Sequence, residues 1–420
     1  MVSTMPNDVG WAKAGGGSVA VVAGIDTHAE THTVAVLDQV GVLLGHAQFP
    51  ASPAGYGQAL AWVGGYGRLG RVGVEGTGCY GVGVTARLLA AGVEVVEVNR
   101  PNRQARRSLG KSDPVDAEQA ARAVLAGTAA AVPKTHAGPV ESIRVILSTR
   151  KSAVRARTAA LNGFHAQLVT APEGLRARLE TLRPAEQLAV AAGFRPVEVF
   201  DPANAVKQVL RRLARRVGSL TAEIAAAEDD LKVLVTGYAP ELVAVTGVGV
   251  LSAAQLLVTA GANPDRFTSR DGFVAACGAS PVPASSGRTD RHRLNRGGDR
   301  AANSALHMIA VTRIRCDAQT RRYAARRRAE GKSTRDILRC LKRYLARRLF
   351  GHIAQAAVQA PRVEPGRPPA CPSKPAGGEP RLQGQGRPKA AAQRARQRPL
   401  RQEERPSYTA RRRTHTLDKT

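Results

Sequence analysis

The order of predicted strands and helices near the N-terminus constrains this chain more than any other feature. Three β-rich runs come first, separated by short polar turns, and this pattern predicts an antiparallel meander. The runs cover residues 19–26, 31–38 and 41–49. Helical and strand patterns then alternate at 55–63, 71–75, 82–91 and 93–98. The resulting order, β-β-β-α-β-α-β-α, predicts an α/β domain in which helices flank a mixed sheet.

The chain changes character after this domain. Residues 137–235 carry helical periodicity and no clear strand signal. In one stretch, apolar residues are spaced alternately by four and three positions, which is a heptad seam. The seam consists of Val206, Leu210, Leu213, Val217, Leu220, Ile224, Ala227 and Leu231. Two interpretations stay open: an intermolecular coiled coil, or packing against the chain's own earlier helix at 142–161.

These shifts predict five segments. They are a flexible leader at 1–17, the α/β domain at 18–135, an all-α or coiled-coil domain at 136–235, a mainly α domain at 236–352 and a disordered basic tail at 353–420. The tail is predicted from composition, because residues 361–420 hold 10 Pro and 15 Lys or Arg against 5 Asp or Glu. Such a segment has no periodic apolar face to bury.

The net charge points to a polyanionic partner. The chain has 62 Lys and Arg against 33 Asp and Glu, a net charge of +29 and a pI near 11.1. A membrane surface and nucleic acid are the two candidates. The longest uncharged run, Leu242–Pro264, holds many Gly, Ser, Thr and Gln residues and is too polar for a membrane span. We therefore expect a cytoplasmic, nucleoid-associated protein that binds nucleic acid.

The five cysteines stand singly along the chain, and no Cys-x-x-Cys pair is present. This spacing indicates neither a zinc site nor a disulfide framework.

Four carboxylates stand out by their positions. Asp26 ends the first β-rich run, and Glu75 ends an apolar strand. Asp113 and Asp116 lie where a helix is expected to begin, and Pro114 suits the first helical position, so Asp113 is the expected N-cap. A spacing of three residues puts both aspartates on one side of the first turn.

If the strands that end at Asp26 and Glu75 are neighbours, all four carboxylates converge at one sheet edge. Clustered carboxylates repel one another, so they need cations, and Mg²⁺ or Mn²⁺ is the natural choice beside phosphate. Two such ions stabilise both the entering and the leaving oxygen of a phosphodiester exchange. The alternative interpretation is that Asp26 is a turn residue and that Asp113 and Asp116 only cap a helix.

A second group of residues lies far along the chain. Ser285 and Ser286 precede Gly287 in a segment with many arginines, which are Arg288, Arg291, Arg293, Arg296 and Arg300. A serine among arginines can reach a phosphate, but a hydroxyl needs a base or a metal to become a nucleophile. The residues alone favour a flexible loop whose arginines hold DNA.

The segment before this loop contains a tight turn between two expected helices, Gly247-Val-Gly249. Such a turn can present backbone N–H groups to a phosphate. It can equally be a plain helix connection.

Three of these motifs resemble the Asp-Glu-Asp-Asp signature of the insertion-sequence one-ten transposases, a family that includes the Piv-type DNA invertases. The motifs are Gly24-Ile-Asp26, Val74-Glu-Gly-Thr-Gly78 and Lys111-Ser-Asp-Pro-Val-Asp-Ala117. The resemblance covers residues 18–130 and 236–350. It implies a RuvC-like, RNase-H-like fold for the first domain and a helix-hairpin-helix-like element at Gly247 and Gly249.

The resemblance also implies a mechanism. Ser286 would be the nucleophile, with Ser285 as the alternative, and would form a 5′-phosphoserine link to DNA. The carboxylates would be assembled beside this serine from another domain or another subunit. A structured non-coding RNA from the element would accompany the DNA of the element ends and target, and a homo-oligomer, a dimer or tetramer, is expected.

Other functions remain open at this point. A RuvC-like structure-selective nuclease would use the carboxylates without the serine, and a non-catalytic nucleic-acid-binding protein would use neither. Residues 76–81 fit Gly-x-Gly-x-x-Gly, which would suit a dinucleotide enzyme. The segment at 24–27 resembles the first phosphate loop of the sugar-kinase and actin fold. Neither a dinucleotide enzyme nor a protein of the sugar-kinase and actin fold accounts for the net charge of +29 or for Ser286.

The two histidines at His28 and His32 are not spaced as in His-Glu-x-x-His. We expect both to be surface turn residues, with His28 near Asp26.

Overall fold

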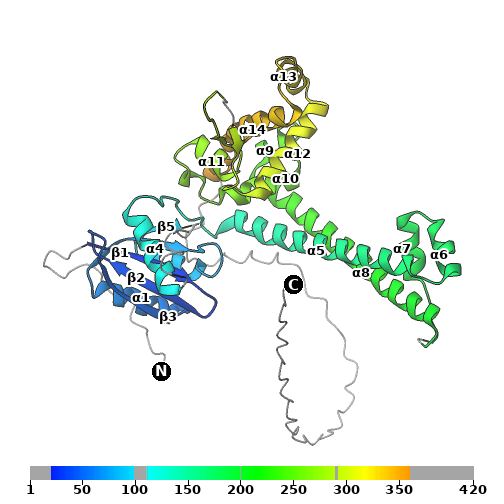
Figure 1. The fold of residues 1–420 in the computed structure, drawn as a ribbon, viewed down its shortest axis with the longest axis horizontal. Helices are drawn as coiled ribbons and strands as arrows, with labels where there is room; N and C mark the ends of the chain where they lie inside the picture. Colours follow the sequence, from blue (N-terminus) through cyan, green and yellow to red (C-terminus); the bar gives the residue numbers. More distant parts are fainter. Residues whose placement is uncertain (1–19, 99–109, 111, 199, 289–291, 360–420) are drawn as a thin grey trace, which may run out of the picture. The chain divides into compact units, whose positions relative to one another are not determined.

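The computed structural model describes residues 20–98, 110, 112–198, 200–288 and 292–359. The expected leader at 1–17 and residues 360–420 of the expected tail lie outside this range. The chain begins with a five-stranded sheet in the order β3-β2-β1-β4-β5 (Figure 1). Its strands are β1 (Ala20–Thr27), β2 (Thr31–Leu37), β3 (Leu43–Pro50), β4 (Arg68–Glu75) and β5 (Glu94–Val98).

The sheet is mixed, as the sequence predicts. β1, β2 and β3 form the expected antiparallel meander, while β4 is parallel to β1 and β5 is parallel to β4. In the parallel pair Ile25 lies opposite Val74. The residues that follow them, Asp26 and Glu75, therefore occupy matching positions at the carboxyl ends of neighbouring strands.

Helices cover both faces of this sheet. They are α1 (Pro53–Gly64), α2 (Val82–Ala90) and α4 (Asp113–Leu125). Val21 and Ile25 of β1 share an apolar cluster with Leu60 of α1 and Leu88 of α2. Because side chains alternate along a strand, Val22 points the other way, where its neighbours belong to α4 and β5. β1 and β2 are buried along almost their whole length for this reason.

Two glycines let α4 touch the sheet backbone. A Cβ atom on Gly24 would lie 2.0 Å from the Ala117 carbonyl oxygen, and one on Gly73 would lie 2.6 Å from that of Ala120. No side chain fits between helix and strands here. The first turn of α4 is thereby fixed over the carboxyl ends of β1 and β4.

The start of α4 differs from the expected position by one residue. The Asp116 N–H donates to the Ser112 carbonyl oxygen at 3.0 Å, so Ser112 is the N-cap and Asp113 is the first helical residue. Pro114 still lies in the first turn, where its missing N–H has no intrahelical partner to lose.

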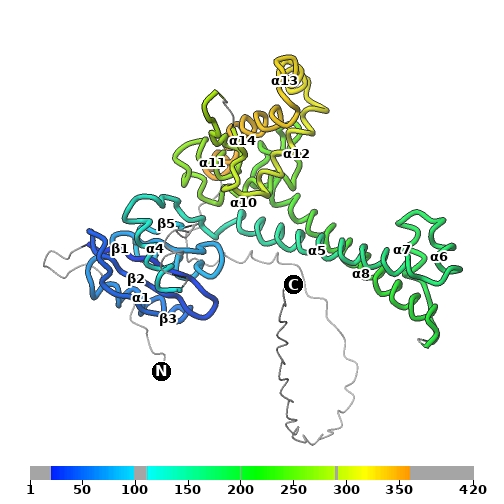
Figure 2. The backbone as a smooth tube through the Cα atoms, viewed as in Figure 1, coloured from blue at the N-terminus to red at the C-terminus, as the bar shows by residue number. Residues whose placement is uncertain are grey.

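The middle of the chain is helical, with two long helices joined through two short ones (Figure 2). They are α5 (Gly138–Val169), α6 (Glu173–Glu180), α7 (Pro184–Ala192) and α8 (Pro202–Tyr238). Leu210 of α8 packs in one cluster with Phe164, and Leu231 packs in another with Ile143. α5 and α8 therefore run antiparallel, and the heptad seam packs against the chain's own earlier helix.

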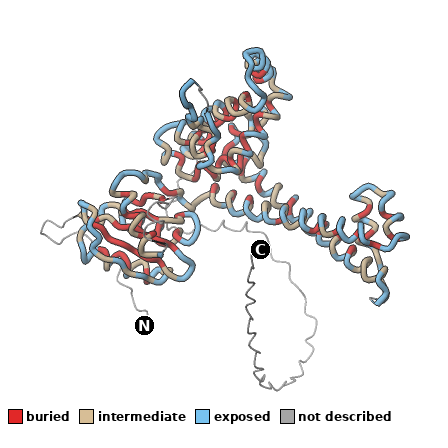
Figure 3. The backbone as a smooth tube through the Cα atoms, in the orientation of Figure 1, coloured by how far each residue is buried: buried red, intermediate tan, exposed pale blue. Residues whose placement is uncertain are grey.

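The last described part is a helical domain with one small hairpin. Its elements are α9 (Pro240–Ala244), α10 (Val250–Ala260), η1 (Pro264–Arg266), α11 (Arg270–Ala276), β6 (Pro281–Pro283), β7 (His292–Leu294), α12 (Arg300–Cys316), α13 (Ala318–Ala329) and α14 (Thr334–Gln359). Its buried core draws on α10, α11, α12 and α14, including Leu256, Phe273, Leu306 and Leu349 (Figure 3).

The helix α14 extends past residue 352, where the tail was expected to start. Residues 353–359 are helical because Ile353 and Ala356 are buried in the same core. None of the helices in the described ranges combines the length and apolar character that crossing a membrane requires.

Candidate active site

Acidic side chains from the first strand and from α4 meet at the edge of the sheet. Asp26 at the end of β1 and Asp116 in α4 are buried, at 8% and 4% exposure. His28 bridges Asp26 and Asp113, with its Nε2 atom 3.2 Å from Asp26 Oδ2 and 3.4 Å from Asp113 Oδ1. Asp26, His28 and Asp113 each offer an atom suited to a metal, and these atoms lie within 4.8 Å of one another.

The charges of this cluster act on one another. Burial raises the pKa of the Asp26 carboxyl above its usual value, and the negative charges of Asp116 and Asp113 raise it further. His28 acts in the opposite direction. The clustering therefore carries an electrostatic cost, which a bound cation offsets.

The donor set fits a hard divalent cation. Carboxylate oxygens are the ligands that Mg²⁺ and Mn²⁺ prefer, and the imidazole nitrogen of His28 is compatible with Mn²⁺. The four predicted acids are not placed alike. Asp26 and Asp113 belong to the three-residue group with His28, and the charge of Asp116 acts on Asp26. Glu75 is half-buried at the end of the neighbouring strand. The Glu75 backbone is tied to this edge because Thr27 Oγ1 donates to its carbonyl oxygen at 2.7 Å.

The two histidines behave differently from each other. His28 is exposed and contacts Asp26, as expected. The prediction for His32 is wrong: the residue is buried at 2% exposure and stacks on Tyr56, with ring centroids 5.5 Å apart. His32 lies in β2 and faces α1, so it belongs to the packing. The contact of His28 with Asp113 was missed, although its position two residues after Asp26 is a signal for it.

The Gly-x-Gly-x-x-Gly segment links β4 to α2. Gly76 has a φ of +74°, which favours glycine, and a Cβ atom on Gly81 would lie 3.0 Å from the Gly76 carbonyl oxygen. The glycines thus serve a tight turn. The antiparallel meander also differs from the parallel sheet of dinucleotide enzymes.

The serines lie at the far end of the small hairpin. Ser285 and Ser286 are exposed in the connection between β6 and β7, next to Gly287 with a φ of +52°. The described arginines of this region are exposed, and they are Arg288, Arg293, Arg296 and Arg300. Arg291 lies outside the described residues.

The base of this hairpin is held firmly. A Cβ atom on Gly298 would lie 2.1 Å from the Gly278 backbone nitrogen, so the two chain segments cross in direct contact. Asp299 caps α12, and its Oδ2 atom accepts from Thr259 Oγ1 at 2.7 Å and from Gln255 Nε2 at 3.2 Å. The serine loop therefore extends from a rigid support.

The turn at Gly247 and Gly249 joins α9 to α10, as expected. Gly247 has a φ of +85° and packs against Arg313. The buried Arg313 guanidinium donates to the Thr246 carbonyl oxygen at 2.8 Å and to Asp317 Oδ2 at 2.9 Å. Gly249 is exposed at the N-terminus of α10. One glycine thus serves packing, and phosphate binding by this turn stays a prediction.

Fold and site define an α/β domain with an acidic centre, followed by a basic helical domain that carries an exposed serine loop. Comparison with known families agrees with this division. A transposase model of the DEDD, IS110 type matches residues 23–171, and the model described as "Transposase IS116/IS110/IS902 family" matches residues 239–325. The two matches together cover more than half of the chain. The chain belongs to the IS110 family of transposases.

Two curated relatives are similar over part of the chain. The insertion element IS900 uncharacterized 42 kDa protein of Mycobacterium paratuberculosis is 30% identical over 156 residues, which are 36% of this chain and 39% of the relative. The insertion element IS110 uncharacterized 43.6 kDa protein of Streptomyces coelicolor is 28% identical over 185 residues, 43% of each chain. The matched part thus spans about two fifths of each relative.

Proposed function

We propose that the protein is a DNA transposase that cuts and rejoins the strands of an insertion sequence. The observation that carries this proposal is the meeting of Asp26, His28 and Asp113 at the carboxyl edge of the sheet. Family membership and the basic charge of +29 support it. The strand order, with β1 central and α4 over the strand ends, supports a RuvC-like, RNase-H-like domain.

Asp26, Glu75, Asp113 and Asp116 would hold Mg²⁺ or Mn²⁺. When bound, the cation supplies charge neutralisation and Lewis acidity at a phosphodiester. The protein contributes a fixed position for each acid: β1 and β4 hold two, and α4, in contact with the Gly24 and Gly73 backbone, holds the other two. His28 orients Asp26 and Asp113 through its Nε2 atom.

Ser286 is the proposed nucleophile. Its Oγ atom attacks the phosphorus, forms a new P–O bond and gives up the hydroxyl proton. The bond to the 3′ oxygen breaks, and that oxygen takes up one proton and leaves as a 3′ hydroxyl, so no net proton is gained or lost. The product is a 5′-phosphoserine, which keeps the energy of the broken phosphodiester. A second 3′ hydroxyl then attacks the phosphoserine and restores both the DNA strand and the serine. The arginines after the serine would stabilise the phosphate charge.

The partners in this proposal are DNA of the element ends and target, a structured non-coding RNA of the element, and further copies of the same chain. A dimer or tetramer would let the serine of one subunit meet the acids of another.

The test is to trap the reaction on a donor-end oligonucleotide in Mg²⁺ and map the modified peptide. We expect a DNA adduct on Ser286, its loss in Ser286→Ala and its retention in Ser285→Ala. An adduct at a residue other than these two serines would contradict the nucleophile assignment. Cleavage by Ser286→Ala without any adduct would favour the metal-dependent nuclease, which the acidic cluster alone would support.

A further inference from the structure

A buried lysine in α14 lacks an acidic partner. Lys342 is 8% exposed, and no carboxylate in the described ranges lies within ion-pair distance of its Nζ atom. Burial and the neighbouring Arg339 lower its pKa. A buried charge without a counter-charge is costly, and an anion from outside the chain would offset this cost.

The position of this lysine is fixed by one side chain. Lys342 Nζ donates to Asn303 Oδ1 at 2.8 Å. Asn303 Nδ2 in turn donates to the carbonyl oxygens of Cys277 at 3.2 Å and Gly278 at 2.9 Å. The amide is therefore oriented with its oxygen toward the lysine. This leaves the remaining ammonium hydrogens of Lys342 available to a ligand.

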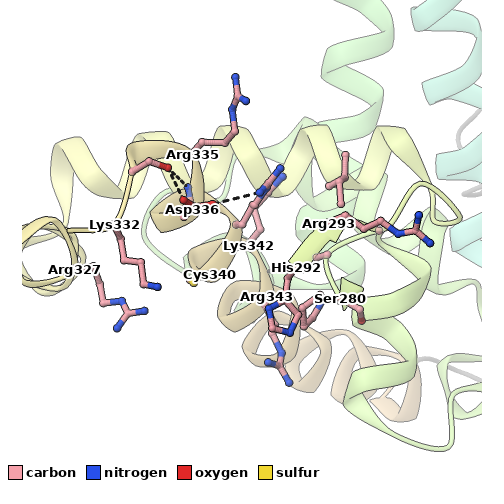
Figure 4. A pocket seen from close by; sticks show the side chains of 16 residues that line it. Ser280, His292, Arg293, Arg327, Lys332, Arg335, Asp336, Cys340, Lys342 and Arg343 are labelled. Atoms are coloured by element: carbon pink, nitrogen blue, oxygen red, sulfur yellow. Dashed lines mark hydrogen bonds and ion pairs between the residues drawn. The ribbon is translucent and has the colours of Figure 1, made fainter. Parts of the chain in front are cut away.

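Lys342 lines two adjoining pockets. The first has a volume of about 790 Å³, and seven of its sixteen lining residues are Lys or Arg against a single acid, Asp336 (Figure 4). That acid is already engaged by Arg339 at 3.3 Å and Ser333 at 2.6 Å. The second pocket holds Arg296, Arg300 and His307 and has no acidic lining residue.

The two pockets also share the base of the serine hairpin. Gly278 and Leu294 line both of them, and Pro281 and Arg293 line the first. Ser286 lies five residues beyond Pro281 in the same hairpin. An extended chain rises about 3.3 Å per residue, so the serine lies within a few nucleotides' length of the pockets.

We infer that the sugar–phosphate backbone of the DNA strand that reaches the serine loop passes through these two pockets, with one phosphate bound by Lys342 Nζ. Two adjoining basic pockets that share one buried lysine suit a chain of phosphates better than a single anion. This inference rests on the proposed function, because it takes the attacked strand as its ligand. Lys342 is here a binding residue that acts before any chemistry.

The experiment measures the affinity of a labelled single-stranded donor-end DNA at several salt concentrations, in EDTA so that no strand is cut. Lys342→Met should weaken binding and reduce the slope of log K against log salt by about one. Arg348→Met removes the same charge from an exposed position of α14 outside both pockets and should leave the slope near that of the wild type. The free Lys342→Met protein should melt no lower than wild type, because a buried unpaired charge is removed.

Asn303→Asp gives a second test that keeps the lysine. One oxygen of the new carboxylate would take the position of Oδ1 and neutralise Lys342, so the change should also reduce the slope. Its other oxygen would face the carbonyl oxygens of Cys277 and Gly278, so the slope is compared for protein that a melting curve shows to be folded. If Lys342→Met and Asn303→Asp both bind with the slope of Arg348→Met, the inference is wrong. The inference is also wrong if the two variants change the salt slope only for binding of an RNA of the same sequence and not for binding of the DNA. If the variants show the expected slopes but the wild-type protein forms no DNA adduct, the proposed function is contradicted and the pocket assignment stays intact.

Discussion

At the scale of single residues, burial decides which groups are reactive. Burial raises the pKa of the Cys277 thiol far above its usual value, so this cysteine stays protonated and is a poor nucleophile. Ser286, in contrast, is exposed at the end of its hairpin. Of these two side chains, only the serine hydroxyl is accessible to a DNA phosphate.

Glu141 gives a pH dependence of stability. Hydrogen bonds from Arg144 and His136 hold the pKa of the Glu141 carboxyl below its ordinary value of 4.5. Because the pKa of Glu141 is lower in the folded protein than in the unfolded chain, its ionised form stabilises the fold at pH values above the unfolded-state pKa. This stabilisation is lost as the pH falls through the pKa of the folded protein. Glu141→Gln should therefore lower the melting temperature at pH 7, and should lower it by less at an acidic pH below the ordinary value of 4.5. Glu223→Gln, at an exposed position of α8, is the control and should have little effect at either pH.

The position of a residue could be predicted where the backbone fixes it. Asp26 and Glu75 could be placed at one edge because each ends an apolar strand, and the start of the helix at Asp113 could be placed to within one residue. Burial could not be predicted in the same way. The sequence predicts a turn residue at His32 because its neighbours along the chain do not reveal that Tyr56 stacks on it. Lys342 lies in a basic helix whose sequence does not show which of its basic residues is buried.

At the scale of elements, the site depends on how closely α4 approaches β1. A Cβ atom on Gly24 would lie 2.0 Å from the Ala117 carbonyl oxygen and 2.3 Å from the Ala121 nitrogen, both rigid backbone atoms. Gly24→Ala should therefore move α4 and cost at least about 1–3 kcal/mol of unfolding free energy. Chemical denaturation measures this cost.

Gly57→Ala is the matched control for Gly24→Ala. Gly57 lies inside α1 with no atom within 4 Å of the added Cβ, so this change should stabilise the fold by about 0.5–1 kcal/mol. Equal stability of the two variants would contradict the close packing of α4 on the sheet.

The helical elements show where periodicity stops being informative. A heptad seam reveals an apolar stripe on α8 but not the helix that covers it, and the covering helix proved to be α5 of the same chain. The helix α14 reaches past residue 353, the expected start of the tail, for a related reason. Ile353 and Ala356 are too few to define a pattern, yet the core that buries them extends the helix to Gln359.

At the scale of the whole molecule, the net charge governs attraction to nucleic acid. Residues 361–420 carry 15 Lys or Arg against 5 Asp or Glu, which is about a third of the net +29. Affinity for duplex DNA falls with salt at a slope near −0.9 per neutralised phosphate. Removing residues 361–420 should make this slope shallower and leave strand cleavage intact, as measured by binding titrations and an adduct assay. An unchanged slope would show that these residues take no part in binding.

In the proposed mechanism, strand cleavage depends on one cation-holding centre formed by acids that lie far apart in the chain. The most direct test measures adduct formation on donor-end DNA by the wild type, Asp26→Asn and Glu118→Gln, in Mg²⁺ and in EDTA. Glu118 lies in α4, as Asp113 and Asp116 do, but pairs with Arg122 at 2.7 Å and is not part of the cluster.

We expect the wild type and Glu118→Gln to form the adduct in Mg²⁺ and not in EDTA. Asp26→Asn should form no adduct in either condition, although it should still bind DNA. In EDTA at pH 7 Asp26→Asn should melt at least as high as wild type, because burial and nearby charges raise the Asp26 pKa and its ionised form opposes folding. A full yield of adduct from a folded Asp26→Asn protein would contradict the account.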